Sequence, residues 1–103
     1  MTAVMFTPEN WNLKIEGHAG FADKCDPVCA GVSTLAYTLI ENLNILSDNL
    51  DTFDVQTDKG FAEITCKPKE GHEATIESVL WVILNGISAL VQAYPDNVSL
   101  KIV

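Results

Sequence analysis

The chain has 103 residues, of which 48% are hydrophobic and 19% are charged. This length fits one domain, and the composition supports a packed core and argues against disorder. The formal net charge of -8 argues against nucleic acid as the main partner, because phosphate binding requires clustered lysine and arginine side chains. The same charge suits a basic peptide or simply keeps the protein dissolved. We therefore expect a single domain over residues 1–103.

The sequence shows no membrane or export signal. The apolar segment 78–90 is interrupted by polar residues and a glycine, which indicates a buried helix rather than a membrane span. The first residues lack a basic region followed by an apolar block, so we expect no signal peptide and a cytoplasmic protein that does not act at a membrane. An odd number of cysteines, three, then indicates free thiols rather than a disulfide framework.

Two short strands open the chain. Residues 3–6 predict a strand, and residues 7–10 contain proline and asparagine, as a turn would. In residues 11–15 apolar and polar side chains alternate, which is the period of a half-buried strand, and this strand runs into Gly17-His18. Residues 20–26 have no periodicity and predict a surface loop.

A long helix and a hairpin follow. Asp26 accepts hydrogen bonds from open amides and Pro27 suits the first helical position, so both indicate a helix start. Apolar residues then recur at helical spacing to about Leu46. Residues 52–57 and 61–67 flank a turn that contains Asp, Lys and Gly, which predicts two strands joined as a hairpin.

A second helix and a last strand complete the pattern. The helix is predicted over residues 74–93, closed by Tyr94-Pro95, and the strand over residues 98–102. The order is therefore ββαββαβ, an α/β (α+β) fold with a small mixed sheet covered by two helices. The sequence leaves open whether both helices lie on one face. Because so small a sheet with long apolar helices often completes its burial by self-association, we expect a homodimer.

A histidine and a cysteine form the candidate catalytic pair. His18 ends the second strand, and Cys29 is the third residue of the first helix, counted from Asp26 as its cap. A thiol attacks as its thiolate, and the partial positive charge of a helix start and a protonated histidine both favour that form. The helix start also offers backbone amides that can receive an oxyanion. Because a lone histidine and a lone cysteine in a small protein are most often structural, the spacing alone leaves nucleophilic catalysis as the alternative interpretation.

The neighbours of this pair fit the same interpretation. Ala30, like the glycine after it, keeps the surroundings of the thiol small, as an approaching peptide backbone requires. Ser33 lies one helical turn after Cys29, where it can orient the histidine or bind substrate. Asp26 is more readily explained as a helix cap than as a catalytic acid.

The sequence gives little support for a redox cysteine pair or a metal site. Cys25 and Cys29 have three residues between them, whereas a redox pair usually has two. No Cys-x-x-Cys pair accompanies the histidines, so we expect no metal and no cofactor. Cys66 alternates with apolar residues on one strand face, which indicates a buried core thiol.

The joint motif resembles a known family. Gly17-His18-Ala19, a loop, and then Asp26-Pro27-Val28-Cys29-Ala30-Gly31-Val32-Ser33 are similar to the signature of the ribosomal-processing cysteine proteases called Prp. The order of strands and helices over the whole chain is also similar. The resemblance implies a homodimeric Cys-His endopeptidase of Firmicutes-type bacteria. Its substrate would be the N-terminal extension of a large-subunit ribosomal protein, the one conventionally numbered twenty-seven.

The resemblance also implies roles for single residues. Cys29 would be the nucleophile and His18 the base, and Gly17, Asp26 and Ser33 match the other motif positions. The loop 19–24 would be the segment that moves to admit substrate. Two alternatives stay open at this point: a related protease that acts on a phage assembly protein, and a non-catalytic dimeric domain that binds a peptide.

Overall fold

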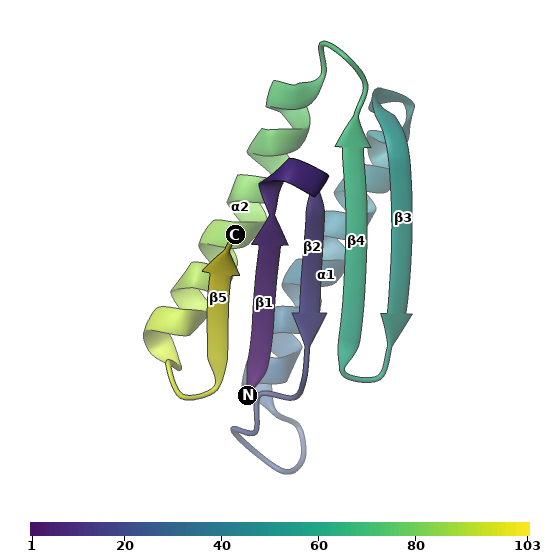
Figure 1. Cartoon of the computed structure of the whole chain (residues 1–103). Coiled ribbons are helices and arrows are strands. Elements are labelled where there is room, and N and C mark those ends of the chain that lie inside the picture. The colour runs from purple at the N-terminus through teal and green to yellow at the C-terminus, as the bar shows by residue number, and fades with distance from the viewer.

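A computed structural model describes residues 1–103 and shows one mixed sheet with two long helices (Figure 1). The predicted order of strands and helices is confirmed. The elements are β1 (Thr2–Thr7), β2 (Asn12–Glu16), α1 (Pro27–Ile45), β3 (Leu50–Asp58), β4 (Phe61–Pro68), α2 (Glu73–Ala93) and β5 (Val98–Ile102). The predicted turn before β2 contains a short 3-10 helix, and a second one precedes β3.

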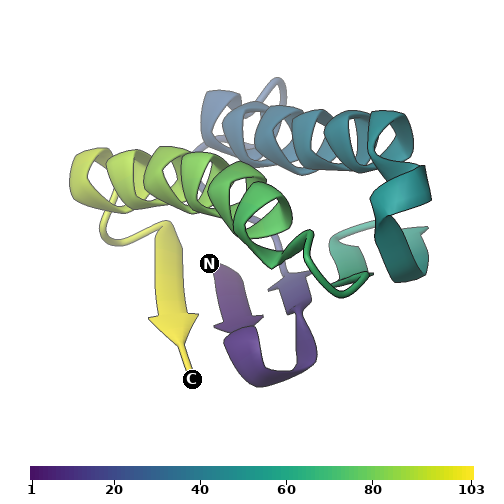
Figure 2. The same ribbon diagram turned by 90° about the horizontal axis from the view of Figure 1, so that it is seen from above.

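The five strands lie in the order β3-β4-β2-β1-β5. Only β1 and β5 pair in parallel, and the other neighbours are antiparallel. Both helices cover the same face of the sheet (Figure 2), which the sequence pattern had left open. This arrangement follows from alternation, since each strand has only one apolar side to bury.

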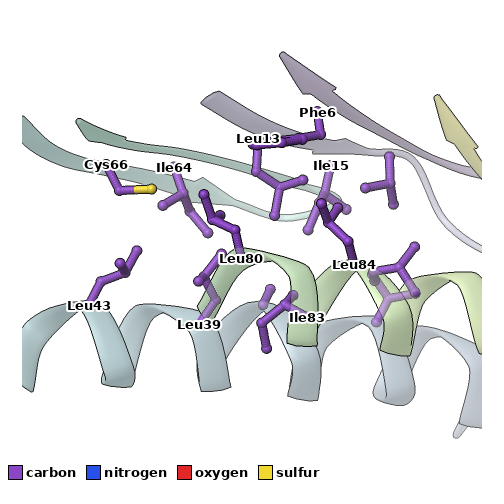
Figure 3. Packing of buried hydrophobic residues seen from close by; sticks show 14 of the residues in the cluster. Phe6, Leu13, Ile15, Leu39, Leu43, Ile64, Cys66, Leu80, Ile83 and Leu84 are labelled. Atoms are coloured by element: carbon purple, nitrogen blue, oxygen red, sulfur yellow. The ribbon is translucent and has the colours of Figure 1, made fainter. Parts of the chain in front are cut away.

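The core lies between the sheet and the two helices. Nineteen buried apolar residues form one cluster, which includes Leu13 and Ile64 from paired strands. Figure 3 shows that Leu39 and Leu43 of α1 and Leu80 of α2 point toward these strands. The opposite face of the sheet is polar, where Asn12 Nδ2 donates to Glu63 and Thr65 at 3.3 and 3.0 Å, and where Lys14 pairs with Glu16 at 3.0 Å.

The second helix agrees with its predicted range to within one residue. The segment 78–90 lies inside α2, whose 21 residues include a window of mean hydropathy 1.7, so by length and composition it is able to cross a membrane. The expectation that the sequence shows no membrane signal was therefore wrong on length and composition. In the fold, Ile76, Leu80 and Ile87 of this helix are buried in the core, which is how an amphipathic core helix uses its apolar side.

Candidate active site

The candidate site is a cleft at the end of the sheet where α1 begins. Its volume is about 230 Å³, and it is lined by residues of β2, α1 and the β3–β4 hairpin. Figure 1 shows the hairpin turn, the start of α1 and the N-terminus at this same end of the molecule. His18, Cys29 and Ser33 all line the cleft. The fold therefore brings the predicted pair to one cavity, although a loop separates them in sequence.

Cys29 is held at the start of α1 with its sulfur facing the end of β2. The side chain is half-buried and packs against the core. The backbone N–H of Ala19 donates a hydrogen bond to Cys29 Sγ at 3.2 Å. An N–H aimed at sulfur stabilises negative charge on that atom, because hydrogen bonds to a charged form favour it. The sulfur is thus open to the cleft on one side and contacted by a backbone donor on the other.

Asp26 links the loop to the helix through both of its carboxylate oxygens. Oδ1 accepts from the N–H groups of Val28 and Cys29 at 2.9 and 3.2 Å, and Oδ2 accepts from Phe21 and Ala22 at 2.9 and 3.1 Å. Desolvation opposes ionisation of this carboxyl, but the four backbone donors outweigh it and hold the pKa of Asp26 below its usual value. The expected role as a helix cap is confirmed, and the carboxylate caps the loop as well.

One expectation about the helix start was wrong. Its amides are not free to receive an oxyanion, because Pro27 has no N–H, Asp26 Oδ1 accepts the next two, and the N–H of Ala30 donates to the Asp26 carbonyl at 3.0 Å. Sequence position alone could not show this, since the cap uses the same donors that an oxyanion would need.

His18 lies against the turn of the β3–β4 hairpin. The N–H of Gly17 donates to the carbonyl of Gly60 at 2.8 Å. A Cβ built on Gly60 would stand 2.9 Å from His18 Nε2, so the imidazole ring rests on the glycine. No hydrogen bond joins the ring to Cys29 Sγ, while the side chain of His18 is exposed and free to turn within the shared cleft. Such contacts often tighten only when substrate binds.

The glycine before the histidine has a steric reason. Gly17 has a φ of 94°, and a Cβ there would overlap the carbonyl oxygen of Met1. The N-terminal strand therefore passes so close to the end of β2 that only glycine fits. The motif position matched by Gly17 thus serves the backbone path that delivers His18.

The remaining motif residues divide between two surfaces. Ser33 and Tyr37 line both the cleft and a neighbouring shallow groove along α1, and Ala30 lines the groove only. The small size of Gly31 was expected to make room for a peptide. Instead, this glycine faces α2, where a Cβ would lie 3.4 Å from Leu90.

The other cysteines lie outside the cleft. Cys25 is exposed in the loop. Cys66 is buried in the core, as predicted, and burial raises the pKa of its thiol to about 12. No group of three or more metal-ligating side chains lies together in the structure.

Three site neighbours, Gly60, Tyr94 and Asn97, had no signal in the sequence. Asn97, from the loop between α2 and β5, donates through Nδ2 to the carbonyl of Ala19 at 2.9 Å. The rings of Phe21 and Tyr94 meet edge to face at 5.1 Å, so the loop also contacts the end of α2. Gly60, Tyr94 and Asn97 come from distant parts of the chain, and only the fold brings them to the motif.

The comparisons with known proteins fit this geometry. The family model described as cysteine protease Prp matches residues 1–99. The ribosomal processing protease Prp of Staphylococcus aureus, solved with a covalently linked product peptide, shares the fold with a TM-score of 0.85 at 19% identity, over 100% of both chains. Its complex with a substrate peptide gives 0.80 at the same 19% and the same 100% coverage. A protein from Streptococcus mutans gives 0.72 at 24% identity, over 98% of this chain and 90% of its own. No curated protein matches the sequence.

Proposed function

Because this chain belongs to the Prp family of cysteine proteases and is a cysteine peptidase, we propose that Cys29 is its nucleophile and His18 its general base. The observation that supports this most directly is the shared cleft, which holds both side chains at the end of the sheet. Cys25 is displaced onto the exposed loop and Cys66 is sealed in the core. Cys29 is therefore the thiol that a peptide bound in the cleft can reach.

The reaction follows acyl-transfer chemistry. His18 turns from Gly60 toward Cys29 and takes the thiol proton, and the sulfur forms a bond to the carbonyl carbon of the substrate. His18 then gives the proton to the departing amine as the peptide C–N bond breaks, which leaves a thioester on Cys29. Water, activated by the same imidazole, adds to the thioester and releases the acid, and the thiol is regenerated.

We assign the oxyanion donor to Ala19 rather than to the helix start. Its N–H lies 3.2 Å from Cys29 Sγ and belongs to a residue that is 2% exposed. The oxygen of a carbonyl under attack lies next to the attacking sulfur, so this N–H is close to the charge that develops there. The helix amides already donate to Asp26.

The proposed substrate is the N-terminal extension of a large-subunit ribosomal protein, the twenty-seventh. Support comes from the motif and from the shared fold with the Staphylococcus aureus ribosomal processing protease, which was solved with a substrate peptide. The acidic chain also suits the basic residues of ribosomal proteins. This proposal places the enzyme in the cytoplasm, where those proteins are made.

Cleavage of a peptide that spans the end of the extension tests the assignment. We expect Cys29→Ala to abolish turnover and His18→Ala to reduce it by roughly 10²–10⁴-fold, the range of general acid–base catalysis. Peptide bond cleavage is followed by mass spectrometry, which also locates the cut.

The chain supplies matched controls for both changes. Cys25→Ala removes the exposed thiol next to the helix, and His72→Ala removes the other histidine, which is exposed at the start of α2. Both should cleave at the rate of the unchanged protein. Turnover by Cys29→Ala equal to that of Cys25→Ala would refute the nucleophile. Turnover of a phage assembly protein peptide but not of the ribosomal one would refute the substrate alone.

A further inference from the structure

We propose that Asn97 is a positioning residue for the nucleophile and acts through Ala19. This inference rests on the proposed role of Cys29. Asn97 Nδ2 donates to the Ala19 carbonyl at 2.9 Å, and the Ala19 N–H donates to Cys29 Sγ at 3.2 Å. The two bonds hold the peptide groups on either side of one Cα. Fixing the carbonyl therefore restrains the direction in which the N–H points.

Asn97 is itself firmly anchored to the sheet. Its carbonyl accepts from the N–H of Thr2 at 2.9 Å, and its N–H donates to the Tyr94 carbonyl at 3.0 Å. The next residue, Val98, begins β5 and pairs with Thr2 of β1. The amide side chain thus projects from a corner that joins a helix end to the central strands. Because the backbone of Asn97 is fixed, its side chain also restrains Ala19, the first residue of the loop that follows His18.

The geometry separates a buried part of the loop from an exposed part. Ala19 is buried, whereas residues 20–25 are exposed and are tied down by the Asp26 carboxylate and by Phe21. Residues 20–25 can therefore move for substrate once their contacts with Asp26 and Tyr94 open, while the Ala19 N–H stays next to the sulfur. The hydrogen bond from the Asn97 side chain keeps Ala19 in place while the rest of the loop moves.

The substitution that isolates this bond is Asn97→Asp. It keeps the shape of the side chain but replaces the NH₂ donor with a carboxylate oxygen, which repels the Ala19 carbonyl. Asn97→Ala removes the donor without adding charge. The backbone bonds of residue 97 persist in both variants, because side-chain changes leave them intact.

The readout is the reactivity of Cys29 toward iodoacetamide as a function of pH. A Cys25→Ser background removes the competing exposed thiol, and mass spectrometry of peptides assigns the label. We expect Asn97→Asp and Asn97→Ala to slow alkylation of Cys29 at pH 7 by about two- to tenfold, the factor that matches one hydrogen bond, and to move the rise of the rate to higher pH. In peptide cleavage, both Asn97 variants should show a larger decrease in kcat than change in KM.

Asn44→Asp is the matched control, because Asn44 is exposed on α1 and its side chain makes no hydrogen bond. Unchanged alkylation profiles in both folded Asn97 variants would overturn the proposal. If neither variant folds, hydrogen exchange of the side-chain amides in the unchanged protein tests the proposal instead. One side-chain amide proton of Asn97 should then exchange with solvent far more slowly than those of Asn44, and equal exchange would overturn the proposal. Retained cleavage by Cys29→Ala would instead refute the proposed function and leave the alkylation result standing.

Discussion

Asp26 shows how much one carboxylate organises in this site. Two of its donors come from the loop and two from the helix, and each pair uses a different oxygen. Asparagine offers only one acceptor oxygen, so it would turn its NH₂ group toward either the loop or the helix. Aspartate is therefore required by the geometry and not merely preferred as a cap.

Stability in acid provides a test of this role. The pKa of Asp26 is lowered from 3.8 in the folded protein, so its contribution is complete above that value and is lost as the pH falls through the lower folded pKa. We expect Asp26→Asn to unfold at lower urea concentration at neutral pH, and to lose less further stability as the pH is lowered below about 4. Urea unfolding curves at several pH values measure this. Parallel pH dependence in both proteins would contradict it.

Gly60 positions His18 in a way that a matched pair of variants can test. Gly60→Ala places a methyl group against the imidazole at a φ of 71°, whereas Gly71→Ala introduces the same kind of strain, at a φ of 90°, with no atom within 4 Å. In both variants the free energy of unfolding should fall by about 1–2 kcal/mol, because alanine is strained at a positive φ. Only Gly60→Ala should also lower kcat, by roughly 10²-fold, because its methyl group fills part of the cleft space in which the His18 ring turns toward Cys29. Equal kcat in the two variants would show that the contact does not matter.

At the level of elements, local patterns predicted most of the fold. Alternation and helical spacing located every strand and both long helices to within about two residues, because each pattern reports the side that an element buries. The Gly17–Ser33 motif likewise predicted that His18 and Cys29 share a site. Gly60 and Asn97 had no such signal, since they act through contacts with residues 42 and 78 positions away that exist only after the sheet has formed.

The packing of α1 on α2 depends on Gly86, a glycine that is needed for its small size and not for an unusual backbone conformation. A Cβ on Gly86 would lie 2.7 Å from Leu35 Cδ2 and 3.1 Å from its Cδ1, so the leucine side chain fills the space that the glycine leaves. The two helices approach closely at this point because one of them has no side chain there.

A double-mutant cycle tests this close approach. Alanine in a helix interior gains about 1 kcal/mol over glycine, while overpacking costs about 1–3 kcal/mol. Gly86→Ala should therefore leave the unfolding free energy unchanged or lower it when Leu35 is present. In a Leu35→Ala background, the same change should raise it by about 1 kcal/mol. Urea unfolding gives all four values, and an equal effect of Gly86→Ala in both backgrounds would contradict the packing argument.

For the whole molecule, acidic side chains outnumber basic ones, and the cleft and the adjoining groove share this imbalance. The chain has 14 acidic and 6 basic side chains. Asp58 is the one Asp, Glu, Lys or Arg residue that lines the cleft, and Glu41 is the one that lines the adjoining groove. A peptide that reaches Cys29 with lysines on one side of the scissile bond therefore meets carboxylates and no opposing cation.

Ionic strength separates this long-range attraction from contacts inside the cleft. Raising salt from about 0.01 M to about 1 M shortens the screening length from about 30 Å to about 3 Å. We expect kcat/KM for a lysine-containing peptide to fall about tenfold over this range, while a peptide with glutamine at the same positions changes little. The loss should appear in KM, because salt does not alter the thiol chemistry after binding. Asp58→Asn should weaken the salt dependence, and identical salt dependence for the two peptides would show that the acidic surface has no part in substrate choice.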